Sequence, residues 1–528
     1  MLIDAGSERS ASDGSDPGAV LEAAMRAEEW PLVIRMLDEH WSLLISTQPA
    51  LLRETVPRLP PHVLAENPRL VLAVEYLRRL SNDRTTTRFR GSAPPAPPVS
   101  LMDTLAQLTS HAAVARADGR LAEAVAAVDE ARSILDDSNA KARDQLAQGL
   151  PDLELQWGLV WEYAGDADRA VQEYVDCFDA ALVVGNTMIG TTAAASVAWI
   201  HALAGRGIQA RHWLDRVTGD EGQWWYRRAV IPAQLARALL LVDEFRFDEA
   251  RTVLAEVDLK EYPERWPFQK LLAAMTATDP LAAFELLTQI DTSSAGLPSR
   301  VMKEGTTGAV VAIARSFLLA TSGHAVEARA ALLAPDADRS TLAGQILLCL
   351  RAASEARLGN HVTAARMVSP LHGRSISSPR TAIAVLAIIA AHELHDGDER
   401  QAGERFAMAA SLATTNRSFY ALSILPGDDL ARLASLTPET LPAPVLATLR
   451  ALAPAGDVDP FARLSGKERE VLATVLALDS VARAAERLFV STNTVKTQLQ
   501  SIYRKTGVNS RAELSDLATR HGMHPGSQ

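Results

Sequence analysis

The feature of this 528-residue chain that most constrains its fold is a spacing that recurs about every 40 residues. A glycine that starts a short loop is followed five positions later by an alanine. The pairs are Gly119/Ala124, Gly165/Ala170, Gly205/Ala210, Gly323/Ala328, Gly359/Ala364 and Gly397/Ala402, with Phe245/Ala250 keeping the spacing and Thr278/Ala283 as a degenerate copy. Glycine lets a helix end in a left-handed turn, and alanine lets the next helix pack closely against the first. The spacing therefore predicts repeated helix–turn–helix hairpins.

Stacked hairpins are the architecture that this repetition favours. A single hairpin cannot bury its apolar face, so neighbouring copies are expected to stack into a solenoid with a concave surface. Composition agrees with helices, because aromatic residues make up only 5% of the chain and its apolar content is mostly Ala, Leu and Val. We therefore predict an all-α protein.

Two stretches show the repeat best, WGLVWEYAGDADRAVQEY (Trp157–Tyr174) and AVARADGRLAEAVAAVDEA (Ala113–Ala131). On their account residues 101–452 resemble a tetratricopeptide-type array of helical hairpins. The period is longer than the usual one of about 34 residues. An irregular all-α domain therefore remains the alternative to a tetratricopeptide-like solenoid.

Breaks in composition divide the chain into six segments. Residues rich in Ser, Asp and Gly open the chain, and Pro-containing clusters mark two linkers. The predicted segments are a disordered leader over 1–18, an N-terminal helical segment over 19–80, a Pro-rich linker over 81–100, the helical repeats over 101–452, a second linker over 453–460 and a C-terminal domain over 461–524. We expect the last domain to fold on its own from about Asp457, because few contacts should cross its Pro/Gly/Asp linker.

Charge separates the C-terminal domain from the rest of the chain. From Phe461 onward there are ten Lys and Arg against six Asp and Glu, a local charge of +4, whereas the preceding residues carry −15 and the whole chain −11. A basic domain favours a nucleic-acid partner, and the acidic part can mask it at low salt.

Location is predicted from what the sequence lacks. No apolar run reaches the roughly 18 residues of a membrane span, and the N-terminus has no secretory-signal pattern. The two cysteines, Cys177 and Cys349, cannot support a disulfide framework. We expect a cytoplasmic protein with no membrane contact, associated with the nucleoid when bound to DNA.

Residues 463–522 contain four helix-sized segments, each opened by a residue type that caps helices. The expected caps are, in order, Ser465 with Glu468 as a capping box, Ser480, Ser491, and Ser510 with Glu513 as a second capping box. The second and third helices are joined by about three residues, which matches a DNA-binding helix-turn-helix. The third helix is expected to run over 491–506.

This third helix separates a packing face from a polar face. At about 100° per residue, one stripe collects Val495, Leu499, Ile502 and Thr506, and the opposite one collects Asn493, Lys496, Thr497, Gln500 and Arg504. The polar side chains suit base edges in the major groove and phosphates. Ser491, Thr492 and Thr494 at the N-terminus can bind phosphate. The alternative, a surface helix with a solvated polar face, leaves the capped helix pair and the basic charge unexplained.

Two nearly continuous stretches, LSGKEREVL (Leu464–Leu472) and AAERLFVSTNTVKTQLQSIYRKTGVNSRAEL (Ala484–Leu514), resemble the C-terminal DNA-binding domain of LuxR-type transcriptional regulators. The resemblance implies four helices, a recognition helix over 491–506 and dimerisation through the fourth helix. Combined with the polar face, it assigns Lys496, Thr497, Gln500 and Asn493 to base contacts, Ser491, Thr492, Thr494 and Arg504 to phosphate contacts, and Leu514, Leu517 and Ala518 to the dimer helix.

The chain departs from that family at four positions. Leu478, Ala484, Gln498 and Thr506 stand where the family usually has Gly, a larger apolar residue, His and Leu. These departures concern the stiffness of the scaffold and the base preference, not the presence of the domain.

The N-terminal helical segment shows a second resemblance. Arg26–Ile45 and Leu52–Leu77 are similar to the helical arm of large ATP-binding LuxR-type regulators. The phosphate-binding motif G-x-x-x-x-G-K-[ST] does not occur, because Gly466-Lys467 is followed by Glu468. We therefore expect neither ATP binding nor any other cofactor.

Two further clusters have competing interpretations. His392 and His395 lie three positions apart near an expected helix end, but no third ligand is evident, so a helix-end cap is preferred to a metal site. The run Trp224–Arg228 can belong to a groove for a ligand or a partner, although packing between repeats is the preferred interpretation.

The sequence thus predicts a bacterial transcriptional regulator. Its helical repeats would bind a ligand or a partner protein, and its C-terminal domain would bind double-stranded promoter DNA as a homodimer. The alternative is a repeat scaffold that binds proteins and whose C-terminal domain no longer reads DNA specifically. An enzyme has no supporting motif, since no nucleophile, base or paired-carboxylate arrangement can be argued from the spacing.

Overall fold

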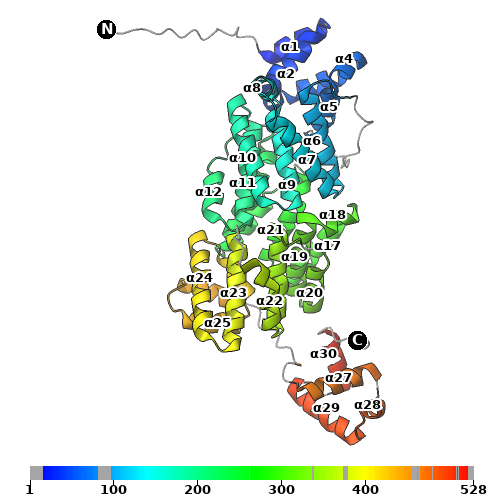
Figure 1. Ribbon diagram of the computed structural model, residues 1–528, viewed down its shortest axis with the longest axis vertical. Coiled ribbons are helices and arrows are strands. Elements are labelled where there is room, and N and C mark those ends of the chain that lie inside the picture. Colours follow the sequence, from blue (N-terminus) through cyan, green and yellow to red (C-terminus); the bar gives the residue numbers. More distant parts are fainter. Residues whose placement is uncertain are drawn as a thin grey trace, which may run out of the picture. The chain divides into compact units, whose positions relative to one another are not determined.

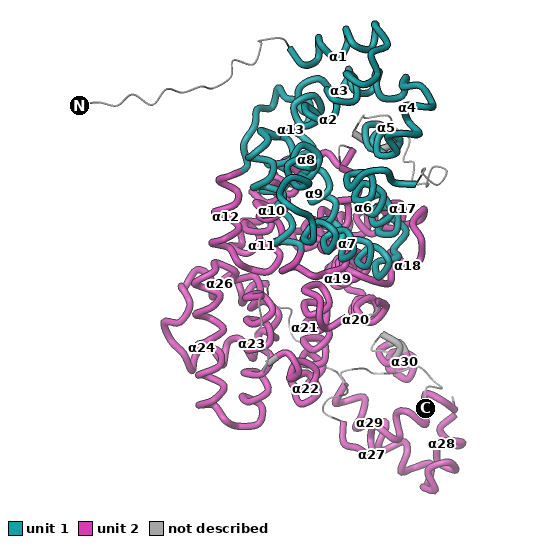
Figure 2. Tube along the Cα trace, turned by 45° about the horizontal axis from the view of Figure 1, so that its top comes forward, with its two compact units in different colours: residues 1–160, 170–194, 217–229 teal, residues 161–169, 195–216, 230–528 magenta. Residues whose placement is uncertain are grey.

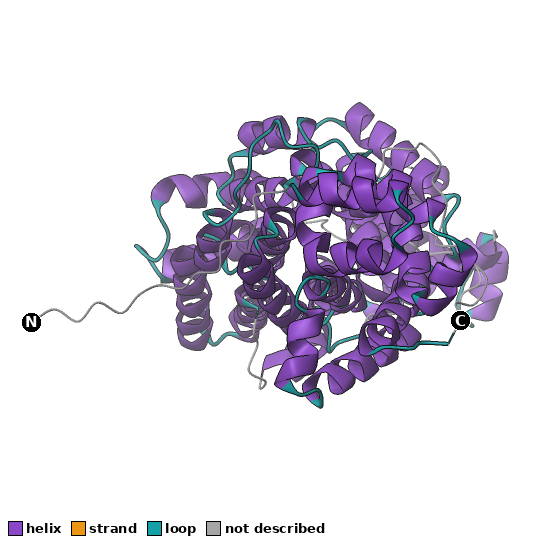
Figure 3. Ribbon diagram, turned by 90° about the horizontal axis from the view of Figure 1, so that it is seen from above, coloured by secondary structure: helices purple, strands orange, loops and turns teal. Residues whose placement is uncertain are grey.

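The computed structural model is helical wherever it describes the chain. The described residues are 16–80, 97–260, 262–335, 338–372, 378–452, 461, 464–478, 480–506, 508 and 510–520. They form helices and connecting loops with no strand among them, which confirms the all-α prediction (Figures 1 and 3). Most of the predicted leader, most of the Pro-rich linker, the whole linker over 453–460 and the chain beyond residue 520 lie outside the described residues.

The chain divides into two compact units (Figure 2). Unit 1 comprises residues 1–160, 170–194 and 217–229, and unit 2 comprises residues 161–169, 195–216 and 230–528. The helices of unit 1 are α1 Pro17–Arg26, α2 Trp30–Thr47, α3 Pro49–Thr55, η1 Val56–Arg58, α4 Pro61–Glu66, α5 Pro68–Leu80, α6 Leu101–Ala117, α7 Leu121–Asp136, α8 Ala140–Leu146 and α13 Tyr226–Ala229. Residues of both units occur in α9 Leu150–Ala164, α10 Ala167–Val184 and α11 Thr187–Leu203.

Unit 2 holds the remaining helices. They are α12 Gly207–Leu214, α14 Ile231–Asp243, α15 Phe247–Ala255, η2 Pro263–Arg265, α16 Trp266–Thr276, α17 Pro280–Ser294, α18 Ser299–Lys303, α19 Gly305–Thr321, α20 Ala325–Leu333, α21 Leu342–Arg357, α22 His361–His372, α23 Pro379–Asp396, α24 Glu399–Asn416, η3 Phe419–Ile424, α25 Gly427–Leu436, α26 Ala443–Leu452, α27 Gly466–Leu478, α28 Val481–Arg487, α29 Thr492–Thr506 and α30 Arg511–Arg520.

The turns of the predicted hairpins have the conformation that the spacing requires. All six repeat glycines adopt left-handed backbone angles, with φ between 76° and 94°, and Phe245 does so with φ of 62°. The eight alanines five positions later are buried, none more than 6% exposed. Helices α6 and α7, α14 and α15, α19 and α20, α21 and α22, and α23 and α24 pack as pairs. The prediction of individual helix–turn–helix hairpins is therefore confirmed.

Within unit 2 the first helix of one hairpin packs on the first helix of the next. Contacts join α14 to α16, α16 to α19, α19 to α21, and α21 to α23. Each hairpin thereby buries an apolar face that it could not bury alone. Their arrangement as a regular solenoid with a concave surface stays a prediction.

A buried arginine fastens the start of α23 to earlier helices of unit 2. Arg380 donates to both carboxylate oxygens of Asp243 at 2.8 and 2.7 Å, and its Nε donates to the carbonyl oxygen of Leu203 at 2.9 Å. Ser418 donates to the same carboxylate at 3.2 Å. A Cβ atom at Gly205 would lie 2.8 Å from the backbone nitrogen of Arg380, so this turn must be glycine for contact as well as for φ.

Cys177 and Cys349 are buried free thiols, as expected for a chain without a disulfide framework. Among the described helices, none is both long and apolar enough to cross a membrane.

Candidate nucleic-acid interface

The C-terminal domain has its own core, which is built from all four of the predicted helices. Helices α27 and α28 precede α29, and α30 follows it. The buried apolar residues of this core are Phe461, Leu464, Val471, Leu472, Val475, Ala484, Ala485, Val495, Leu499, Ile502, Leu514 and Ala518. This core packs the apolar stripe of α29 against the other three helices of the domain.

Each of the four predicted cap serines accepts a backbone hydrogen bond at its helix start. Ser465 and Glu468 form a reciprocal capping box: the hydroxyl of Ser465 accepts from the backbone N–H of Glu468 at 3.3 Å, and its own backbone N–H donates to that carboxylate at 2.7 Å. The hydroxyls of Ser480, Ser491 and Ser510 each accept from the backbone N–H three residues on, at 3.4, 3.1 and 3.2 Å. These bonds satisfy donors that a helix start leaves open.

Glu468 also links two helices of the domain, a role that the sequence did not indicate. Its carboxylate accepts from Lys505 Nζ at 2.6 and 2.8 Å and from Ser501 Oγ at 2.7 Å, so it joins the start of α27 to the last turns of α29. The hydrogen bond from Lys505, followed by those from the Ser465 backbone and Ser501, lowers the pKa of Glu468 to about 2. Only its capping role could be predicted, because these partners lie more than thirty positions away.

Helix α29 presents the two faces that its sequence predicts. Val495, Leu499 and Ile502 are at most 4% exposed and pack into the domain core, and Thr506 is half-buried. The eight residues assigned to DNA are all exposed: Ser491, Thr492, Asn493, Thr494, Lys496, Thr497, Gln500 and Arg504. All eight are thus accessible, and Asn493, Lys496, Thr497, Gln500 and Arg504 share the face opposite the buried stripe.

Three of these side chains already make hydrogen bonds inside the domain. The hydroxyls of Ser491 and Thr494 lie 2.8 Å apart, and Ser491 also caps the helix. Thr497 donates its hydroxyl proton to the carbonyl oxygen of Asn493 at 2.9 Å. The hydroxyl proton of Thr497 is therefore engaged with the helix backbone in this structure.

The turn before α29 and the helix before that turn add exposed residues. Phe489 has a φ of 55° and is 96% exposed, so a non-glycine residue makes the left-handed step of the turn. On α28, Arg483 and Arg487 are exposed one helical turn apart. The first helix of a helix-turn-helix crosses the DNA backbone, where arginine binds phosphate. Their spacing of four in the sequence, one helical turn, indicates that they share a face of this helix.

The residues assigned to the dimer helix lie in or against the core of the domain, and their role in dimerisation stays a prediction. Leu514 and Ala518 are fully buried in the core of the domain itself, and Leu517 is partly buried against it. An apolar spacing on α30 identified its packing face, which in this chain faces α27 and α29 residues of the same domain. Any contact through α30 must use its outward face.

Residues 462–518 match the family model described as bacterial regulatory proteins, luxR family. The C-terminal domain is a LuxR-type helix-turn-helix domain. This domain supports a role as a DNA-binding transcription regulator. A search of curated proteins found no match to the chain.

Outside the LuxR-type domain, the tryptophan cluster of unit 1 is packed. Trp225 is 2% exposed and lies against Tyr226 with ring centroids 6.3 Å apart. Trp224 is 37% exposed and donates its indole N–H to the carbonyl oxygen of Ser46 at 3.0 Å. The packing interpretation accounts for Trp225, and a recognition role for Trp224 stays a prediction.

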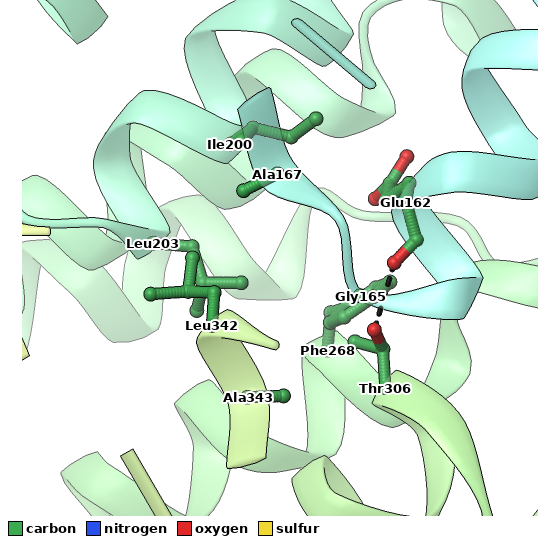
Figure 4. A pocket seen from close by; sticks show the side chains of 9 residues that line it. All are labelled: Glu162, Gly165, Ala167, Ile200, Leu203, Phe268, Thr306, Leu342 and Ala343. Atoms are coloured by element: carbon green, nitrogen blue, oxygen red, sulfur yellow. Dashed lines mark hydrogen bonds between the residues drawn. The ribbon is translucent and has the colours of Figure 1, made fainter. Parts of the chain in front are cut away.

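A cavity in unit 2 is too small for an effector molecule. Ile200, Leu203 and Leu342 line one side, and Glu162 and Thr306 lie on the other (Figure 4). Thr306 donates to the carbonyl oxygen of Glu162 at 2.7 Å. The cavity volume of about 20 Å³ holds roughly one water, whereas ligand pockets usually measure about 300–1,000 Å³.

The histidines near the end of α23 have the partners that the sequence left unidentified. His395 Nε2 lies 2.7 Å from a carboxylate oxygen of Asp429 on α25, and the ring of His361 on α22 stacks on the ring of His395. The fold thus brings an imidazole and a carboxylate from two other helices next to His395, while the preference for a helix-end cap over a metal site stays untested.

Proposed function

We propose that this chain regulates transcription by placing α29 in the major groove of specific promoter sites. The observation that carries the proposal is the exposed polar face of α29, which is opposite a buried apolar face in a matched LuxR-type domain. Capping by Ser491 and the tie from Glu468 to Lys505 fix where that face points. A recognition helix needs such fixed orientation because base contacts tolerate little displacement.

Base reading is assigned to the middle of the exposed face. Lys496 can donate to guanine O6 and N7, and Gln500 can pair with adenine N6 and N7. Asn493 and Thr497 extend the same face toward the N-terminus of the helix. These four side chains are expected to set sequence preference.

Phosphate binding is assigned to the ends of α29 and to α28. Ser491, Thr492 and Thr494 lie at the N-terminus of α29, where backbone N–H groups and the helix dipole favour an anion. Arg504 lies near its other end. We add Arg483 and Arg487 of α28, which are exposed on the helix that crosses the backbone. These contacts fix register without reading sequence.

Binding as a homodimer is part of the proposal. LuxR-type domains typically dimerise. Because Leu514 and Ala518 are buried in the domain, the contact would use the outward face of α30 and the partly exposed edge at Leu517. Two domains would then read two half-sites about one helical turn of DNA apart.

The helical repeats are proposed to receive the regulatory signal by binding a ligand or a partner protein. The charge of −15 on the residues before Phe461, against +4 after it, favours electrostatic masking of the DNA-binding face until that signal arrives. We also propose that a fragment over 457–528 folds and binds DNA without the repeats. If full-length protein and fragment bound the same duplex equally at every salt concentration, masking would be excluded.

The function is tested by mapping the genomic sites that the protein binds in the source organism. A duplex with one of these mapped sites, called the recovered site, and a scrambled duplex are then titrated with the protein. We expect the recovered site to bind at least about 10³-fold more tightly at physiological salt, with an affinity that falls as salt rises. Equal, weak binding to both duplexes would instead favour the scaffold interpretation.

A further inference from the structure

Two imidazoles and a carboxylate converge in unit 2 from helices that are separate in sequence. His361 begins α22, His395 lies in the last turn of α23, and Asp429 lies in the first turn of α25; α23 packs against both other helices (Figure 1). One potential ligand atom from each residue lies within 4.8 Å of the others. His395 Nε2 is 2.7 Å from Asp429 Oδ1, and His361 Nδ1 is 3.9 Å from Asp429 Oδ2.

The cluster leaves two polar atoms buried without a hydrogen-bond partner, namely Nδ1 of His361 and Oδ2 of Asp429. The Asp429 residue is only 4% exposed, so water cannot reach its second oxygen freely. A buried polar atom without a partner costs about 1–3 kcal/mol and calls for an explanation. The two atoms lie 3.9 Å apart, too far for a hydrogen bond between them, and one ion coordinated by both would satisfy both.

We propose that His361, His395 and Asp429 bind a divalent transition-metal ion, with Zn²⁺ as the ion that this donor set best fits. Imidazole nitrogen and carboxylate oxygen are common zinc ligands, and imidazole also suits Cu²⁺, Ni²⁺ and Fe²⁺. Calcium and magnesium are disfavoured, because they require oxygen ligands. The proposal concerns the repeats and goes beyond DNA binding.

Binding requires a small movement of one ring. The imidazoles of His361 and His395 are nearly parallel, 15° apart with centroids 3.6 Å apart, whereas each ring must direct a nitrogen lone pair at a shared ion. The side chain of His395 is 40% exposed and has room to turn, while that of His361 is 12% exposed. Water can complete four-coordination.

A metal ion bound at this site would connect three helices at the end of the hairpin series. The ion would join α22 of one hairpin to α23 of the next and to α25 beyond it. Because the site does not exist in the unfolded chain, binding must stabilise this part of the fold. The chemistry therefore makes the repeats responsive to a metal ion.

The test uses full-length protein without an affinity tag, stripped with a chelator and titrated with Co²⁺, whose visible absorption reports coordination, and then with competing Zn²⁺. We expect one ion per chain and a higher melting temperature with Zn²⁺. Asp429→Asn and His395→Ala should each weaken metal binding by at least about 10-fold. Loss of a residue that only hydrogen-bonds to a metal ligand already lowers metal affinity by about 10- to 100-fold.

Matched controls separate this site from adventitious histidines. His324→Ala removes a histidine whose side chain is 59% exposed, and His521→Ala/His524→Ala removes two near the chain end. Both variants should bind like the wild type. Absence of Co²⁺ absorption at one equivalent, or unchanged Zn²⁺ affinity in His395→Ala with its metal-free melting temperature retained, would overturn the proposal. Should His395→Ala unfold, His395→Gln provides the same comparison.

Discussion

Replacing Arg380 by methionine should destabilise unit 2 strongly. The guanidinium donates four hydrogen bonds: two to Asp243, one to the carbonyl oxygen of Leu203 and one to that of Ala202. Asp243 is 1% exposed, and without Arg380 the partner that remains to its carboxylate is Ser418 at 3.2 Å. Removing one member of a buried pair typically costs about 3–5 kcal/mol, because the other charge stays buried without compensation. We expect a loss in that range.

Tryptophan fluorescence during urea denaturation measures this loss. All nine tryptophans precede residue 267, so the signal reports the N-terminal helical segment and the repeats, and not the LuxR-type domain. Arg400→Met is the matched control, because Arg400 is 73% exposed in its pair with Glu404 and should change stability by less than about 0.5 kcal/mol. Adding Asp243→Leu to Arg380→Met should recover part of the loss by removing the orphaned charge. A cost below about 1 kcal/mol for Arg380→Met, or a further loss in the double variant, would refute the reasoning.

Three further predictions address the LuxR-type domain and Glu154 of unit 1. The folded-state pKa of Glu468, about 2, lies below its ordinary value of 4.5, so the stability that its carboxylate contributes is complete above pH 4.5 and is lost as pH falls toward 2. Circular dichroism of the 457–528 fragment should show that Glu468→Gln flattens the fall in stability at acid pH. An unchanged fall would contradict the hydrogen bond between Glu468 and Lys505. Arg504→Ala should weaken specific and random duplexes alike and lower the slope of log affinity against log salt by about 1, measured by fluorescence anisotropy; a loss confined to the specific site would make Arg504 a base contact. Burial raises the pKa of Glu154 to about 8, above its ordinary 4.5, so the folded state loses stability as pH rises from 4.5 to 8. Glu154→Gln should flatten this part of a plot of melting temperature against pH. An unaltered plot would count against a protonated Glu154.

The hairpins were predictable because their determinants are local. Gly397 ends α23 with a φ of 90°, and Ala402 is fully buried one turn into α24, where those two helices pack. Both requirements fall within six residues of each other, so a repeated spacing is enough to reveal them. The caps of the LuxR-type domain were predictable for the same reason, since each bond spans three residues.

Contacts between distant residues were not predictable from spacing. Arg380 and Asp243 are 137 positions apart, and nothing in either neighbourhood indicates the other. The cluster of His361, His395 and Asp429 joins three helices, and only the His392/His395 pair had a local pattern. Such partners are chosen by how hairpins pack on one another, which a single sequence without homologues does not reveal.

The two apolar faces of the LuxR-type domain show where periodicity stops being informative. Spacing identified the buried stripe of α29 through Val495, Leu499 and Ile502, and the structure confirms it. Spacing alone could not tell whether Leu514 and Ala518 pack within the domain or against a second copy. In the structure both side chains are buried in the core of their own domain.

The central claim is that the outward face of α29 reads DNA sequence, and Lys496 and Gln500 test it most directly. The measurement is the affinity of Lys496→Ala and Gln500→Ala for the recovered site and for a random duplex, with circular dichroism as the folding control and Lys467→Ala, exposed on α27, as the matched variant. Each of the two α29 variants should lose about 1–3 kcal/mol on the specific site and relax preference at one base pair, with little change on the random duplex. Neither should unfold the domain, because both side chains are exposed. Undiminished preference for the recovered site in both folded variants would contradict the account.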